Sequence, residues 1–152
     1  MLYVPRLRQP DDVSCLPTAV TSVLRFHGYP ADYADVADAC KLGPLGALQE
    51  ISLQGLLEAG YEVEVMSEFD SSSLSDALEQ ERPVIVTLMG GPLAPGSFGH
   101  AVVACGLDED AVTVMDPARG DYVRVPWDSF VKRVGRGISG ALIIGAAQEA
   151  AL

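Results

Sequence analysis

The first part of the chain carries its apolar residues at the spacing of an amphipathic helix. Between residues 14 and 28, apolar and small side chains recur every three or four positions, so they share one helix face. Ser14 is suited to cap the amino end of this helix, and Pro17 is tolerated in a first turn. Gly28 is suited to end it.

Two further helices are expected, over 32–40 and about 48–59, with Gly60 ending the second. Their spacing again places apolar side chains on one side of each helix. The residues expected to face the core are Val36, Cys40, Ile51, Leu56 and Leu57.

The second half of the chain reads as strands, several of which alternate apolar and polar residues at a period of two. Short helices are expected over 73–81 and 127–134, and the acidic stretch 108–110 is a turn that joins two neighbouring strands as a hairpin. Helices followed by antiparallel strands predict an α+β fold with the helical part packed on a sheet. The expected strands span 61–66, 83–89, 99–106, 111–115, 122–125 and 141–144.

Length and composition indicate a single folded domain over residues 1–152. The chain is 49% hydrophobic and 20% charged, which excludes a disordered chain. At this length a domain buries roughly two-thirds of its unfolded surface, so it needs no disulfide or metal to fold. Ten basic residues against 21 acidic ones give a net charge of −11. Nucleic acid and anionic membrane would repel this chain, so neither is expected as its main partner.

The cysteines and histidines indicate free thiols and no metal site. Cys15, Cys40 and Cys105 lie far apart, which is a poor disulfide framework, and the spacing of His27 and His100 does not suit zinc. No metal or organic cofactor is therefore expected. The amino end lacks the apolar core of a signal peptide, and no apolar run reaches the ~18 residues of a membrane span. The expected location is the cytoplasm.

Cys15 is the first candidate for chemistry, because it stands at the predicted start of a helix. Unpaired backbone N–H groups and the helix dipole favour the thiolate there, and the thiolate is the nucleophilic form. The alternative is that Cys15 is a small buried apolar residue, as most free cysteines are.

His100 and Asp116 are the candidates for a base and its partner. His100 opens a strand after the Gly- and Pro-rich segment 90–99, which we expect to line a cleft, and a thiol nucleophile needs such a base within reach. Asp116 ends the next strand, so pairing through 108–110 would bring it to the same sheet end, where it could fix the tautomer of His100. The alternatives are a polar strand end and an ordinary Asp-Pro turn.

Gln9 is a weaker candidate, six residues before Cys15. Its amide could donate to a developing oxyanion together with the Cys15 N–H, and otherwise it is a solvated residue of a leading loop. We interpret His27 as a packing or helix-capping residue, and Arg119 and Arg124 as the basic groups nearest the presumed site.

The order and spacing of these residues resemble the papain-like cysteine peptidases that remove double-glycine leaders from bacteriocins. That family has a Gln six residues before its nucleophile, a Gly-His before apolar strand residues, and an Asp-Pro about sixteen residues later. Here the matches are Gln9 and Cys15, Gly99-His100-Ala-Val-Val, and Asp116-Pro117, with 16 positions from His100 to Asp116. The likeness covers about residues 4–144. It implies that Cys15 is the nucleophile, His100 the base, Asp116 the orienting residue and Gln9 the oxyanion donor.

The chain departs from the family on both sides of the nucleophile. The family has Asp-Cys-Gly there, whereas this chain has Ser14-Cys15-Leu16, so a side chain beside the sulfur is expected to reshape the approach. The best-known members are amino-terminal domains of membrane transporters. We expect a stand-alone domain here, with a transporter or a peptide-maturation protein as the partner that the resemblance implies.

The resulting prediction is a cysteine peptidase acting on a peptide or protein, with leader processing as the implied role. An acyl transferase or a deamidase could use the same three groups, because an acyl-enzyme accepts amines as well as water and a thiolate can attack a Gln side chain. A papain-like module that binds a leader or a partner without catalysis is the third alternative.

Overall fold

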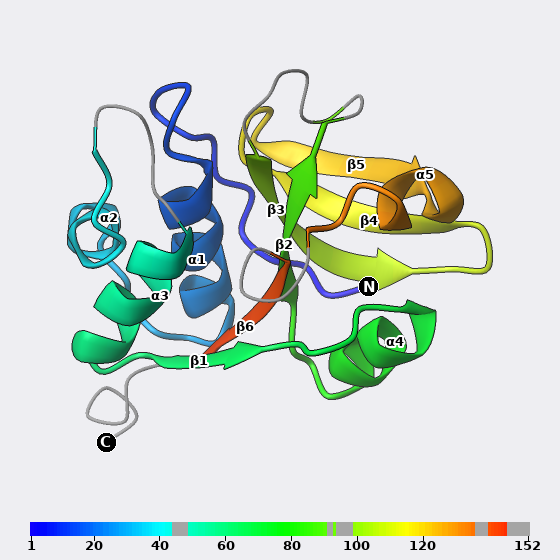
Figure 1. The fold of residues 1–152 in the computed structure, drawn as a ribbon, viewed down its shortest axis with the longest axis horizontal. Coiled ribbons are helices and arrows are strands. Elements are labelled where there is room, and N and C mark those ends of the chain that lie inside the picture. Colours follow the sequence, from blue (N-terminus) through cyan, green and yellow to red (C-terminus); the bar gives the residue numbers. More distant parts are fainter. Residues whose placement is uncertain (44–48, 91–92, 94–98, 136–139, 146–152) are drawn as a thin grey trace.

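The computed structural model describes residues 1–43, 49–90, 93, 99–135 and 140–145 (Figure 1). Its helices are α1 (Cys15–Phe26), α2 (Tyr33–Ala39), α3 (Gln49–Glu58), α4 (Ser71–Glu79) and α5 (Trp127–Val131). Its strands are β1 (Glu62–Val65), β2 (Val84–Met89), β3 (Gly99–Leu107), β4 (Ala111–Asp116), β5 (Asp121–Pro126) and β6 (Ala141–Gly145).

The six strands form one antiparallel sheet in the order β1-β6-β2-β3-β4-β5. The helices α1, α2 and α3 gather on one side of it, with α1 against β3 and β6 (Figure 1). The helices α4 and α5 cover the other face, against β2 to β5. The α+β class, with a helical part packed on an antiparallel sheet, is confirmed. In the described part of the chain, we find no helix with the length and apolar character that a membrane crossing requires.

Alternating strand residues divide the core between the two sheet faces. On the α1 face, Ala101 and Val103 pack with Leu24, whereas Val102 and Ala104 face α4 and α5. This follows from the period of two along a strand, which sends successive side chains to opposite faces. Burial of both faces explains why the sheet needs apolar residues at nearly every position of β2 and β3.

The helix α1 begins and ends where the sequence predicts, but its amino end is capped differently. Gly28 adopts a φ of 84°, and the N–H groups of Gly28 and Tyr29 donate to the carbonyls of Arg25 and Leu24, both at 3.0 Å. These two bonds form a Schellman motif, which a positive φ at glycine permits. Ser14 occupies the N-cap position without making a side-chain cap bond.

The prediction for α3 is partly wrong. Leu56 is fully buried as expected, but Ile51 and Leu57 are 48% and 51% exposed. The reason is Gly55: a Cβ there would lie 2.0 Å from the carbonyl oxygen of Ala39, so α3 approaches α2 through the face that carries Gly55. Close backbone contact, rather than the number of apolar residues, decides which side of α3 is buried.

The remaining elements agree with the prediction to within a few residues. Val36 and Cys40 are fully buried, and Gly60 ends α3 with a φ of 95°. The helix expected over 73–81 begins earlier, at Ser71, because Asp70 caps it and accepts from the Ser73 N–H at 2.7 Å. The last helix ends at Val131 instead of residue 134.

Candidate active site

Cys15 is the first residue of α1, and its sulfur meets the start of β3. The Ala101 N–H donates to Cys15 Sγ at 3.4 Å, and the neighbouring His100 is the side chain that most lowers the pKa of this thiol. Burial by itself would raise the pKa of Cys15. The hydrogen bonds from His100 and Ala101 outweigh it and lower the pKa below the ordinary 9.0. The thiolate form is therefore more favoured here than in an unperturbed cysteine.

His100 and Asp116 stand at the ends of adjacent strands and are joined directly. The distance from His100 Nε2 to Asp116 Oδ1 is 2.6 Å, and the two side chains are 12% and 2% exposed. The hairpin expected at 108–110 joins the strands, with the Asp108 N–H bonded to the Ala111 carbonyl at 2.9 Å. The sulfur, the imidazole and the carboxylate thus form one continuous chain of contacts.

The surroundings of His100 favour its protonated form. Burial lowers the pKa of His100, but the hydrogen bonds to Asp116 and Cys15 raise it to about 9. Asp116 Oδ1 also accepts from the Ala118 N–H at 3.0 Å, which holds the carboxylate in place against the ring. A lowered thiol pKa beside a raised imidazole pKa is the condition for a thiolate–imidazolium pair.

Gln9 lies beside the turn that follows Asp116. Its backbone N–H donates to the Pro117 carbonyl at 2.8 Å, and its side-chain Nε2 donates to the Asp11 carbonyl at 2.7 Å. Gln9 Oε1 is buried, with no hydrogen-bond partner within the described ranges. The described contacts therefore place Gln9 next to the Asp116 turn, and they do not include one to Cys15.

The comparison with known families shows to which family this chain belongs. The sequence model of the Peptidase_C39 like family matches residues 1–135. The chain belongs to this family. A search of the curated proteins found no match.

Solved C39 structures share the fold of this C39-like chain. The peptidase domain of Streptococcus ComA, a bifunctional ABC transporter of a quorum-sensing pathway, matches with a TM-score of 0.73 at 20% identity, over 93% of this chain and 97% of that one. A double glycine motif protease from an AMS/PCAT transporter, solved in complex with the leader peptide, matches with a TM-score of 0.69 at 19% identity, over 94% and 91%. The expected resemblance and the papain-like fold are confirmed.

Leu16, one of the two residues at which this C39-like chain departs from the family pattern, is a core residue. Its side chain is 4% exposed and packs in the core between α1 and the sheet. The effect of Leu16 on the approach to the sulfur stays a prediction.

Gly99 holds the start of β3 close to its neighbour β2. A Cβ at this position would lie 2.9 Å from Thr87 Cγ2 and 3.1 Å from Met89 Sδ. The Gly before His100 in the family pattern thus has a packing reason, because a side chain there would push His100 away from Asp116.

Gly99→Ala should therefore destabilise the fold by about 1–3 kcal/mol, the usual effect of overpacking, and slow any reaction that uses His100. Urea unfolding and the rate of Cys15 alkylation measure the two effects. Thr87→Ser removes the methyl group that clashes, so the double variant Gly99→Ala/Thr87→Ser should recover part of both. Equal stability of Gly99→Ala and the wild type would contradict this explanation.

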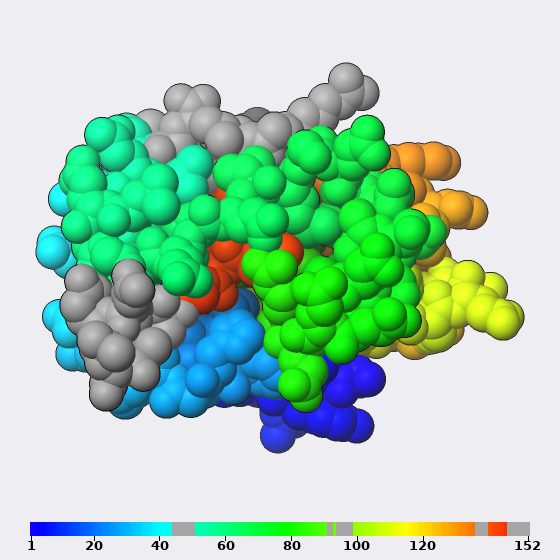
Figure 2. Space-filling model, turned by 90° about the horizontal axis from the view of Figure 1, so that it is seen from below, coloured from blue at the N-terminus to red at the C-terminus, as the bar shows by residue number. Residues whose placement is uncertain are grey.

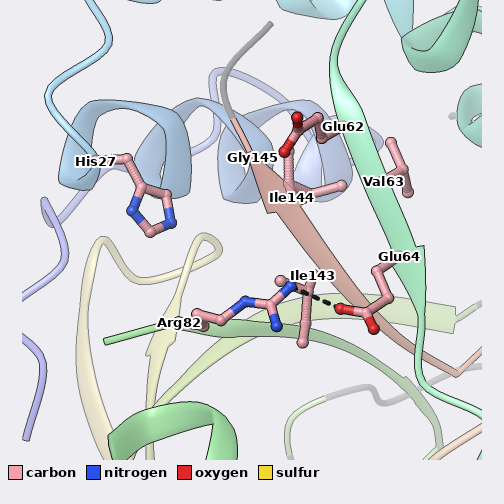
Figure 3. A pocket seen from close by; sticks show the side chains of 8 residues that line it. All are labelled: His27, Glu62, Val63, Glu64, Arg82, Ile143, Ile144 and Gly145. Atoms are coloured by element: carbon pink, nitrogen blue, oxygen red, sulfur yellow. Dashed lines mark hydrogen bonds and ion pairs between the residues drawn. The ribbon is translucent and has the colours of Figure 1, made fainter. Parts of the chain in front are cut away.

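His27 lies far from Cys15, at the other end of α1, whose 12 residues span about 18 Å. It is exposed, it occupies the C-cap position as expected, and its ring meets Phe26 edge-on with the centroids 5.3 Å apart. It lines a hollow of about 290 Å³ with Arg82 and the carboxyl end of β6, where Arg82 pairs with Glu64 at 2.6 Å (Figure 3). Figure 2 shows β6, in red, at the bottom of this hollow.

Of the two candidate arginines, one lies at the site, and the two remaining cysteines lie in the core. Arg119 Nε lies 3.6 Å from Asp116 Oδ2, whereas Arg124 pairs with Asp108 at the distant hairpin and is not near the site. Cys40 and Cys105 are buried, and burial raises the pKa of each to about 12, which fits core thiols.

Two donors of the site were missed by the sequence, the backbone N–H groups of Ala101 and Ala118, because a main-chain group carries no residue-type signal. The segment 90–99, expected to line a cleft, lies outside the described residues except for Gly90, Leu93 and Gly99.

Proposed function

We propose that this chain is a cysteine peptidase in which Cys15 is the nucleophile, His100 the proton carrier and Asp116 the orienting residue. The observation that supports this most is the 2.6 Å contact between His100 Nε2 and Asp116 Oδ1, beside a Cys15 sulfur that accepts from the neighbouring Ala101 N–H at 3.4 Å. A nucleophile bonded to a base, itself held by a third group, is the arrangement that covalent hydrolysis requires.

The proposed reaction uses each of these groups in turn. The Cys15 thiolate attacks the peptide carbonyl carbon, and the carbonyl oxygen becomes an oxyanion. The imidazolium of His100 gives its proton to the leaving amine as the C–N bond breaks, which leaves a thioester. Neutral His100 then takes a proton from water, and the hydroxide attacks the thioester carbon. The C–S bond breaks, which releases the acid and leaves the Cys15 thiolate beside the His100 imidazolium, as at the start.

Gln9 and the Cys15 backbone are the proposed donors to the oxyanion. The amide Nε2 carries two hydrogens, and its bond to the Asp11 carbonyl uses one, so the second is left for a substrate oxygen. The Cys15 N–H lies in the first turn of α1, where helix geometry provides no intrahelical acceptor. Donors of this kind are worth about 10²–10³ in rate.

Asp116 is proposed to act through His100 and not on the substrate. At 2% exposure its carboxylate is shielded from water, so its charge acts strongly on the imidazolium. The Ala118 N–H bond holds the carboxylate, which in turn holds the His100 ring through its Nε2.

The proposed substrate is a peptide cut during maturation, such as a leader peptide. This rests on the shared fold, because the AMS/PCAT structure that matches holds a leader peptide and is described as a double glycine motif protease. A transporter or another peptide-maturation protein is the corresponding partner. A panel of synthetic peptides with a Gly-Gly site and matched Ala-Ala peptides tests the specificity.

The pH dependence of two reactions tests the proposed pair. Alkylation of Cys15 by iodoacetamide needs the thiolate, so its rate should fall with decreasing pH at a transition below the ordinary 9.0, because the Cys15 pKa is lowered. Peptide cleavage also needs protonated His100. It should therefore decline as the pH rises through about 9, the raised pKa of that ring. The two transitions belong to the coupled pair.

A short cysteine peptide provides the reference for alkylation. If Cys15 shows the same alkylation transition as this peptide, the pair does not form and the proposed function fails. Intact-mass analysis of the products, with and without an added amine, separates hydrolysis from acyl transfer and from deamidation.

A further inference from the structure

The amino-terminal strap, defined here as residues 2–9, ties the candidate site together. It starts on β3, where the Leu2 N–H donates to the Cys105 carbonyl at 2.7 Å. It ends at the turn after Asp116, where the Gln9 N–H donates to the Pro117 carbonyl at 2.8 Å. The strap therefore connects the sheet to the residue proposed as oxyanion donor.

The middle of the strap is held from both sides by hydroxyl groups. Tyr122 Oη, on the edge strand β5, donates to the Val4 carbonyl at 2.6 Å. Ser22 Oγ, on α1, donates to the neighbouring Pro5 carbonyl at 2.7 Å. Val4 is only 1% exposed, so water is a poor substitute for these donors.

Two side chains of the strap, Arg6 and Tyr3, also contact residues of β5. The Arg6 guanidinium lies 5.9 Å from the centre of the Tyr122 ring and pairs with Asp121 at 3.4 Å. Tyr3 meets the same ring edge-on, with the centroids 6.5 Å apart. Tyr122 is thus the residue of β5 that the strap contacts most fully.

A close contact between Arg8 and Gly120 sets the distance between the strap and the turn that follows Asp116. At Gly120, which has a φ of 65°, a Cβ would lie 2.9 Å from Arg8 Cβ and 3.3 Å from the Arg8 backbone. The turn therefore packs directly against the residue before Gln9. A shift of the strap must move Gln9 relative to the turn that carries Asp116.

We propose that Tyr122 is a positioning residue for the oxyanion donor: by holding the Val4 carbonyl, it fixes the strap and so the place of Gln9 beside the Asp116 turn. This rests on the proposed function, because it assumes that Gln9 stabilises the oxyanion. Tyr122 touches none of the reacting atoms and acts only through the strap.

Two reactions of the same sulfur separate this role from a general structural one. Acylation of Cys15 by p-nitrophenyl acetate passes through a tetrahedral oxyanion, whereas alkylation by iodoacetamide is a direct displacement without one. Tyr122→Phe, which removes only the hydroxyl, should slow acylation about tenfold and change alkylation less than twofold. Stopped-flow release of p-nitrophenol and mass spectrometry of the alkylated chain measure the two rates.

Two further variants calibrate the result. Gln9→Ala should show the same selective loss of acylation, at about 10²-fold, because it removes the donor itself. Tyr3→Phe is the matched control, since Tyr3 is 75% exposed, and it should change neither rate. Ser22→Ala, which frees the adjacent carbonyl from the α1 side, should act like Tyr122→Phe. Circular dichroism at the assay temperature establishes that each variant is folded.

The outcomes separate the inference from the function on which it rests. If Gln9→Ala slows acylation but folded Tyr122→Phe does not, the positioning role is wrong while the proposed function stands. If Tyr122→Phe lowers acylation and alkylation equally, its role is structural and the inference is overturned. If wild-type Cys15 is neither acylated nor selectively alkylated, the proposed function itself fails.

Discussion

Replacing Cys15 with alanine should abolish peptide cleavage and leave the fold intact. The sulfur is the only proposed bond-forming group, and loss of a catalytic nucleophile costs at least about 10³ in rate. Cys15 is partly exposed at the first position of α1, where alanine is a good helix former, so stability should change little. Mass spectrometry of a cleaved peptide and thermal unfolding by circular dichroism measure the two quantities.

Cys105→Ala is the matched control for this variant. Cys105 is fully buried, and its pKa of about 12 keeps it a neutral thiol, so its removal should lower stability without lowering the cleavage rate of the folded protein. Cleavage that survives in purified, folded Cys15→Ala would exclude the proposed mechanism.

Replacing His100 with glutamine should have the second large effect, a loss of about 10³–10⁴ in cleavage rate. Glutamine cannot carry a proton to the leaving amine, and it brings no positive charge to the Cys15 sulfur. The hydrogen bond from His100 is the largest of the effects that lower the Cys15 pKa, while burial acts to raise it. In His100→Gln the transition for Cys15 alkylation should therefore move to higher pH, which a pH series with iodoacetamide measures.

His27→Gln serves as its control, because His27 is an exposed histidine at the opposite end of α1. It should leave both the cleavage rate and the alkylation transition unchanged. If His100→Gln instead keeps the wild-type alkylation profile, the low thiol pKa has another origin, and His100 is not the base.

The burial of Asp116 supports a functional explanation of its pairing with His100. A carboxylate at 2% exposure is unfavourable unless it is bonded, and here the His100 ring and the Ala118 N–H provide the bonds. Packing alone would not require a charged residue at the end of β4. The raised pKa of His100 and the lowered pKa of Cys15, next to this carboxylate, are shifts typical of sites that carry chemistry.

The pattern of the sequence determined the elements of this fold and the family to which it belongs. The helix ending at Gly28, the β3–β4 hairpin and the order of Cys15, His100 and Asp116 were all predicted, because each depends on local spacing or on a turn between neighbouring strands. Local periodicity indicates which residues share a face of a helix or strand. It can be recognised in the sequence without knowing what packs against that face.

Tertiary structure alone decided which faces are buried and how the polar groups of the site are bonded. Ile51 and Leu57 are exposed because Gly55 brings α2 onto another side of α3, and Leu16 turns into the core. The hydrogen bonds from the Ala101 N–H to Cys15 and from the Gln9 N–H to the Pro117 carbonyl depend on how loops and strands distant in sequence meet. Spacing along one element cannot specify such contacts, because they depend on the placement of a second element that the first does not encode.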